Sequence, residues 1–80
     1  MYFVYILASL KNNSYYVGSC EDIEERLSRH NNGYVRSTKV FTPWKLVYKE
    51  KYDTLSLARK RELQIKLWKS REAIERLILK

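Results

Sequence analysis

The clearest candidates for chemistry in this chain are two polar side chains next to an expected apolar stripe. Arg26 and His30 stand one turn apart on a segment with helical periodicity, and both fall within about 60° of the apolar residue Ile23. A guanidinium and an imidazole beside the core are not needed for packing. We therefore expect them to carry a function.

Two tyrosines and one glutamate are further candidates, each with an ordinary alternative. Tyr5 and Tyr16 lie in apolar segments near the N-terminus, where each could be a core aromatic whose hydroxyl reaches the surface. Glu62 lies at the border of an apolar helical face, because Ala58 and Ile65 are its neighbours at i−4 and i+3. Periodicity alone equally allows Glu62 to be the ion-pair partner of the basic residues before it.

The sequence gives little support for a ligand contact at Gly18, a cysteine nucleophile, or a histidine or cysteine metal site. Gly18 either kinks the end of a strand or lets a ligand approach closely. Cys20 and His30 could be proposed as nucleophile and base, but the thiol has no orienting third group, so we interpret Cys20 as a small packed residue. With a single histidine, a single cysteine and no glycine-rich phosphate loop, the sequence offers no paired-histidine or cysteine-cluster metal site.

The elements that must position these side chains follow from periodicity and capping residues. Asp22 and Ser70 are expected N-caps, Asp53-Thr54 starts a long helix, and Asn32-Gly33 ends the first one. Residues 34–43 read as a basic surface loop. The order β-β-α-β-α-α predicts an α+β fold, a small three-stranded antiparallel sheet flanked by three helices, in one domain over 1–80. The expected strands are 2–7, 15–19 and 44–52, and the expected helices are about 23–31, 55–69 and 71–78.

The charge predicts a polyanionic partner. Sixteen Lys and Arg against nine Asp and Glu give a net charge of +7, and residues 59–71 hold six bases and one acid. A basic protein that is merely soluble is the alternative. One cysteine cannot form an intrachain disulfide, which favours a reducing cytoplasmic location, and the apolar N-terminal stretch is too short for a membrane span.

Taken in order along the chain, these features resemble the GIY-YIG endonuclease family. The residues that carry the resemblance are VYI at 4–6, YVG at 16–18, Arg26, His30 and Glu62, with PWKLVY between the two helices. Val4 stands where the family motif has its first glycine. The likeness covers nearly the whole chain and is closest to small stand-alone bacterial members, which are similar to the N-terminal nuclease domain of an excision-repair incision subunit.

The resemblance implies metal-dependent hydrolysis of phosphodiester bonds in DNA, with a role in DNA repair. Tyr16 matches the general base and Tyr5 assists it, while Arg26 neutralises the phosphate. Glu62 matches the carboxylate ligand of one Mg²⁺ or Mn²⁺ ion, and His30 matches a position that is often histidine in this branch. The basic loop and helix would hold the nucleic acid, and the residues expected there are Arg36, Lys39, Lys45, Arg59, Arg61 and Lys66.

Two other function classes stay open on the sequence. A nucleic-acid-binding module without chemistry would use the same basic surface, with Tyr34 and Trp44 available for base stacking. A basic protein-interaction module is the third possibility. The sequence also leaves open a larger repair assembly or a homodimer. The nuclease hypothesis requires that the five catalytic candidates meet in one solvent-open pocket.

Overall fold

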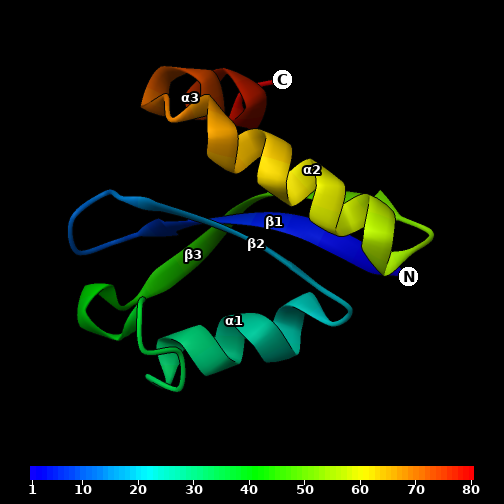
Figure 1. Ribbon diagram of the computed structural model, residues 1–80. Helices are drawn as coiled ribbons and strands as arrows, with labels where there is room; N and C mark the ends of the chain where they lie inside the picture. Colours follow the sequence, from blue (N-terminus) through cyan, green and yellow to red (C-terminus); the bar gives the residue numbers. More distant parts are fainter.

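The computed structural model describes residues 1–80 and has the predicted α+β architecture and element order (Figure 1). A three-stranded antiparallel sheet lies between α1 on one face and α2 on the other, with α3 beyond the C-terminal end of α2. No helix has the length and apolar character needed to cross a membrane. The elements are β1 (Tyr2–Ser9), β2 (Tyr15–Cys20), α1 (Ile23–Asn31), a short 3₁₀ helix η1 (Lys39–Phe41), β3 (Trp44–Tyr52), α2 (Leu55–Trp68) and α3 (Arg71–Ile78).

β1 is the central strand of the sheet, in the order β2-β1-β3. Its side chains alternate between the two faces, so Val4 and Ile6 face α2 while Tyr5 and Leu7 face α1. All four are at most 2% exposed, which confirms that this apolar run is covered on both sides. β2 is an edge strand, paired with β1 on one side only.

Each face of the sheet has its own hydrophobic core. The α2 face contains Val4, Ile6, Val17, Ala58, Ile65 and Leu77. The α1 face contains Tyr5, Leu7, Cys20 and Trp44, against which Ile23 and Leu27 of α1 pack. The predicted stripe of α1 is therefore confirmed, although both of its residues stay half-buried.

The helix boundaries agree with the predicted caps. Each helix begins after a residue whose side chain accepts a hydrogen bond from a backbone N–H three positions later, and these residues are Asp22, Thr54 and Ser70. α1 ends at Asn31 with Asn32 as its C-cap, followed by Gly33 with φ +76°. α2 ends at Trp68, one residue earlier than expected, because Lys69 takes the left-handed conformation with φ 48°.

The predicted surface loop 34–43 contains more order than its sequence suggested. It holds η1, and Thr38 within it is 1% exposed. The indole N–H of Trp44 donates to the Thr38 carbonyl at 2.9 Å, which ties the loop to the start of β3. Local sequence could not reveal this because the tryptophan belongs to another element.

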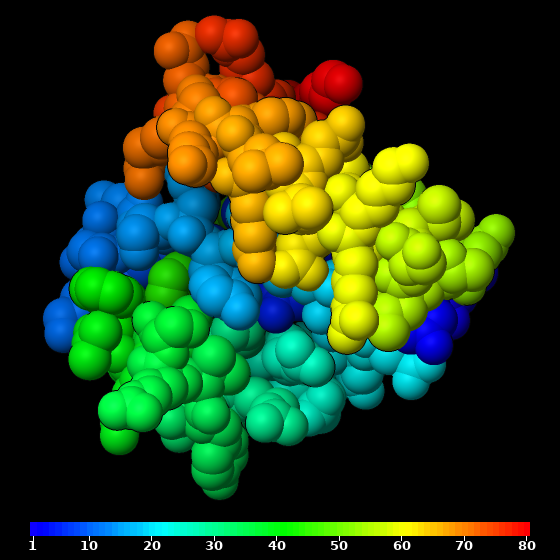
Figure 2. All heavy atoms as spheres, viewed as in Figure 1, coloured from blue at the N-terminus to red at the C-terminus, as the bar shows by residue number.

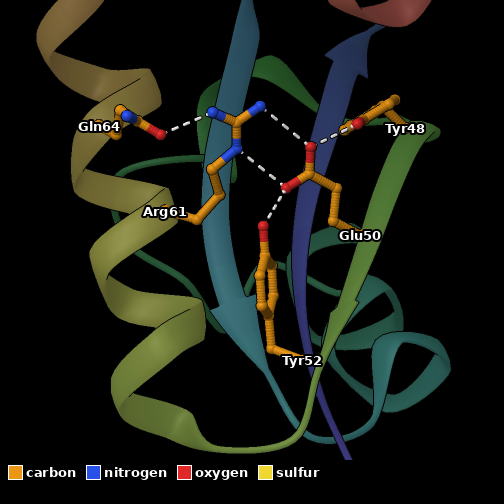
Figure 3. Close-up of polar contacts among 5 residues, drawn as sticks. All are labelled: Tyr48, Glu50, Tyr52, Arg61 and Gln64. Atoms are coloured by element: carbon orange, nitrogen blue, oxygen red, sulfur yellow. Dashed lines mark hydrogen bonds and ion pairs between the residues drawn. The ribbon is translucent and has the colours of Figure 1, made fainter.

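A polar network fixes α2 against β3 (Figure 3). The Arg61 guanidinium donates to both oxygens of the Glu50 carboxylate, at 2.9 and 3.1 Å, and to Gln64 at 2.6 Å. The hydroxyls of Tyr48 and Tyr52 also donate to Glu50. Burial by itself would raise the pKa of Glu50, but these hydrogen bonds and the Arg61 charge hold it below its usual value.

We expect Arg61→Met to lower the free energy of unfolding by about 1–3 kcal/mol at neutral pH, because it leaves a half-buried carboxylate without its cation. A lowered folded-state pKa stabilises the protein above the ordinary carboxyl pKa, and this contribution is lost as pH falls through the lowered value. The difference between variant and wild type should therefore shrink toward about pH 3 in urea unfolding. Arg76→Met is the control, because its ion pair with Glu72 is exposed. Equal effects of the two variants would contradict a structural role for the network.

Candidate active site

A chain of hydrogen bonds links β1, α1 and the 34–43 loop. The Tyr5 hydroxyl lies 3.2 Å from His30 Nε2, and His30 Nδ1 lies 2.8 Å from Thr38 Oγ1. Tyr5, His30 and Thr38 are each at most 2% exposed. The idea that the Tyr5 hydroxyl reaches the surface is therefore wrong, since the hydroxyl ends against the buried imidazole.

The partners in this chain define which nitrogen of His30 carries the proton. The Thr38 hydroxyl donates to the Val35 carbonyl at 3.3 Å, so Thr38 Oγ1 accepts from His30 Nδ1–H. His30 Nε2 is then an acceptor, and the Tyr5 hydroxyl donates to it. Burial, together with the charges of Arg26 and Arg29, lowers the pKa of His30 and keeps the ring neutral at pH 7.

Tyr16 lies beside this chain with its hydroxyl free. Its ring is 4.8 Å from that of His30 and 6.3 Å from those of Tyr5 and Trp44, measured between centroids. Tyr16 is half-buried, and no protein group bonds its hydroxyl. Of the two candidate tyrosines, only Tyr16 can therefore offer its oxygen to a molecule from solvent.

Arg26 brings positive charge to the same face of the sheet. Burial raises the pKa of the Tyr5 hydroxyl, the like charge of Tyr16 adds to this, and the Arg26 guanidinium opposes it. Arg26 Nε is buried and has no hydrogen-bond partner. An unsatisfied charged donor is costly, so an anion that reached Arg26 would be bound favourably.

Gly18 is opposite Tyr5 in the pairing of β1 with β2, and its lack of a side chain has a steric reason. A Cβ built on Gly18 would lie 2.4 Å from the Tyr5 hydroxyl oxygen and 2.6 Å from Cζ. The Tyr5 ring thus lies across the backbone of Gly18 on its way to His30. The close approach at Gly18 is made by a side chain of the protein, whereas the sequence suggested a strand kink or the approach of a ligand.

Glu62 reaches β2 from the opposite face of the sheet. Its Oε1 accepts from the Ser19 hydroxyl at 2.5 Å, and its Oε2 accepts from Lys66. Ser19 faces α2, whereas its neighbour Gly18 lies on the α1 face under Tyr5. The five candidates therefore do not meet in one solvent-open pocket, and that expectation is corrected: four of them share the α1 face, and Glu62 approaches the same edge strand from the other side. A nuclease would have to bring the two groups together on its substrate at the edge of β2.

The edge of β2 is where the two sides can meet, because no further strand covers it. The free face of the molecule has a recess between α1 and α2, with dark-blue atoms of β1 visible at its floor (Figure 2). A strand with a partner on both sides would have separated the two faces. An extended substrate lying along this edge would touch both helices.

The donors near Glu62 suit a hard cation held loosely. A carboxylate and a hydroxyl are the oxygen ligands that Mg²⁺ and Mn²⁺ accept. No group of three or more His, Cys, Asp or Glu side chains gathers anywhere in the chain in a way that could hold a metal. The residues fit an ion whose remaining ligands are water and substrate oxygens, and they do not fit a permanently bound structural metal.

The basic candidates divide into two groups. Arg36, Lys39, Lys45 and Arg59 are exposed and have no carboxylate partner. Lys66 is exposed and contacts Glu62. The Arg61 guanidinium instead donates hydrogen bonds to Glu50 and Gln64, on the side of α2 that faces β3 (Figure 3).

Sequence reasoning missed two residues of the site, Thr38 and Ser19. It interpreted Cys20 as a packed residue, which the structure supports. The Thr38 hydroxyl bonds His30, and the Ser19 hydroxyl bonds Glu62. In the sequence, nothing distinguishes this threonine and this serine from other hydroxyl residues. Burial raises the pKa of the Cys20 thiol, which opposes its use as a nucleophile and agrees with its interpretation as a packed residue. Partners of this kind come from distant segments, so spacing along the chain does not reveal them.

Comparisons with known proteins give one consistent result. A family model described as the GIY-YIG catalytic domain matches residues 1–75. A UPF0213 protein of Staphylococcus saprophyticus is 40% identical over 75 residues, covering 92% of this chain and 90% of that protein. A UPF0213 protein of Staphylococcus aureus is 43% identical over 68 residues, covering 84% and 82%. The solution NMR structure of a UPF0213 protein from Bacillus halodurans superimposes with a TM-score of 0.59 and 30% identity, covering 98% of this chain and 83% of that one.

Proposed function

This chain belongs to the GIY-YIG family, and from that premise we propose that it is a metal-dependent endonuclease that hydrolyses phosphodiester bonds in DNA. GIY-YIG domains are typical of endonucleases, and a nuclease domain implies a nucleic-acid partner. The observation that carries the proposal is the gathering of Tyr5, Tyr16, Arg26 and His30 next to Gly18, with Glu62 held on the adjacent Ser19.

Tyr16 is assigned as the general base because its hydroxyl has no partner within the protein and the residue is only half-buried. In this role it takes a proton from the water that attacks the phosphorus atom. Tyr5 cannot do this directly, since its hydroxyl is buried and donates to His30. Tyr5 and His30 instead hold the neighbouring Tyr16 ring in place, His30 by edge-to-face packing and Tyr5 by a tilted contact.

Arg26 and Glu62 are assigned to the charge of the phosphodiester. The Arg26 guanidinium binds the phosphate oxygens as negative charge develops on them, and its buried, unpartnered Nε supports this assignment. Glu62 holds Mg²⁺ or Mn²⁺, which when bound supplies Lewis-acid stabilisation of the same charge. His30 stays neutral and fixes Tyr5 through Nε2, while its Nδ1–H bonds Thr38 and holds the ring in place.

The nucleic acid is proposed to follow the recess between α1 and α2 (Figure 2). Arg59 and Lys66 stand one turn before and one turn after Glu62 on α2, where they would contact flanking phosphates. Arg36, Lys39 and Lys45 extend this basic surface along the loop and the start of β3. Arg61, being committed to Glu50, contributes chiefly by fixing α2.

The cellular setting follows from the same proposal. A nuclease of this family with a free cysteine suits the cytoplasm, where the thiol stays reduced. DNA repair is the role that we propose, through a larger repair assembly or a homodimer that would add substrate contacts.

The direct test is cleavage of labelled single-stranded, duplex and branched DNA across a titration of Mg²⁺ and Mn²⁺. We expect cleavage only with metal, and we expect Tyr16→Phe to reduce the rate by about 10²- to 10⁴-fold, because the variant keeps the ring but removes the proton acceptor. Tyr34→Phe is the matched control, since Tyr34 is 74% exposed, is not one of the five catalytic candidates, and keeps its ring for any base stacking. Undiminished cleavage by Tyr16→Phe would remove the assignment of the general base.

The alternative of a binding module without chemistry has one observation in its favour. Both oxygens of Glu62 already have partners within the protein, Ser19 and Lys66. Such a module would bind DNA with an affinity that falls steeply with salt, and it would cut no substrate at any metal concentration.

A further inference from the structure

We infer that Lys66 competes with the divalent metal ion for the Glu62 carboxylate, so that Lys66 sets the metal affinity of the protein. The inference rests on the proposed function, in which Glu62 is the protein ligand of the metal. It adds a residue outside the family motif to the control of that site.

Each oxygen of the Glu62 carboxylate already has a partner within the protein. Oε1 accepts from the Ser19 hydroxyl, and Oε2 accepts from the Lys66 ammonium one helical turn later. A hydroxyl can remain beside a metal ion, because its oxygen is itself a possible ligand. An ammonium has no lone pair and carries a positive charge, so it must leave when a divalent cation arrives.

This ion pair differs from the other helical pairs of the chain. Four pairs join a carboxylate and a basic residue at i and i+4. The side chains of Glu25, Glu72 and Glu75 are 46–75% exposed, whereas that of Glu62 is 19% exposed. An exposed pair is largely screened by water, so its loss matters little. A mostly covered carboxylate has less water to replace a lost partner, and competition for it is correspondingly stronger.

The geometry also explains why Lys66 would not simply vacate the site. Ser19 fixes the carboxylate on β2, and the Lys66 backbone is fixed one turn away on α2. The ammonium therefore stays within reach of Glu62 whenever no other cation occupies it. The metal must therefore displace the Lys66 ammonium, which is attached to the same protein and whose effective concentration at Glu62 does not fall when the protein is diluted.

The test measures Mn²⁺ binding without nucleic acid, from the loss of the electron paramagnetic resonance signal of free Mn²⁺. We expect Lys66→Met to bind Mn²⁺ about five- to tenfold more tightly than wild type, because a unit charge about 4 Å away is removed together with the competing contact. Lys60→Met is the matched control. It lowers the net charge equally on the same helix, yet Lys60 contacts no carboxylate, and its affinity should stay within about twofold of wild type.

Glu62→Gln separates failure of this inference from failure of the proposed site. If Glu62→Gln loses Mn²⁺ binding while Lys66→Met binds no more tightly than Lys60→Met, the metal site stands and the competition is wrong. If Glu62→Gln binds Mn²⁺ as well as wild type, the assignment of Glu62 as the metal ligand fails, and the inference fails with it. Weaker binding by Lys66→Met would also overturn the competition, since it would make Lys66 a supporting residue.

Discussion

Gly18→Ala is expected to lower the free energy of unfolding by about 3 kcal/mol and to reduce DNA cleavage by at least about 10³-fold. The added Cβ would lie 2.4 Å from the Tyr5 hydroxyl oxygen and 2.6 Å from Cζ, distances that force one of the groups to move. Tyr5 is 2% exposed and packs in the core of the α1 face, so its ring has nowhere to go. The displaced hydroxyl would lose His30, and Tyr16 would lose its packing partners.

The measurement pairs urea unfolding with the cleavage assay. Gly33→Ala is the control for a glycine whose requirement is conformational: its φ is +76°, and the nearest atom to an added Cβ is 3.5 Å away. That variant should lose about 1 kcal/mol and keep its activity. If Gly18→Ala were as stable and as active as Gly33→Ala, the contact between Gly18 and Tyr5 would have no importance for the site.

Glu62→Gln is expected to reduce cleavage by about 10³-fold or more while the protein stays folded, because the change removes the negative charge that would attract the metal in the proposed mechanism. The amide is nearly isosteric and can still accept from the Ser19 hydroxyl, so the link between α2 and β2 is preserved. Cleavage should not recover fully at high Mn²⁺ concentration, since an amide oxygen is a poorer ligand for a hard cation.

Glu72→Gln is the matched control for this prediction. Glu72 also pairs with a basic residue at i+4, but on α3 and with both side chains about three-quarters exposed. Its loss should leave cleavage and metal dependence unchanged. Circular dichroism of both variants checks the fold, and full activity of a folded Glu62→Gln would exclude a catalytic role for this carboxylate.

The arrangement of the candidate site depends on β2 being an edge strand. Tyr16 projects from it toward α1 and Gly18 lies on the same face under Tyr5, while Ser19 projects toward α2 and holds Glu62. Neighbouring residues of β2 therefore place functional groups on opposite faces of the sheet, close to each other at its edge. In the proposed nuclease, an edge open to solvent would let a phosphodiester contact both sets, which a central strand would prevent.

The sequence by itself determined the elements and their order. Strands and helices were predictable because their signals are local: the uninterrupted apolar run 2–7, the caps Asp22 and Ser70, and the stop at Asn32-Gly33. The charge excess and the order of the motif residues indicated the family, which the comparisons confirm. These properties need no knowledge of which segments touch.

Only the tertiary structure decided what each polar side chain contacts. Thr38 hydrogen-bonds His30 from the loop, Glu50 forms an ion pair with Arg61, and the Ser19 hydroxyl donates to Glu62 from the opposite face of the sheet. Each contact joins residues from separate elements, so it depends on how the sheet and helices pack. Periodicity shows which face of a helix a residue occupies, but the partner on the facing element is set by long-range packing that no local pattern encodes.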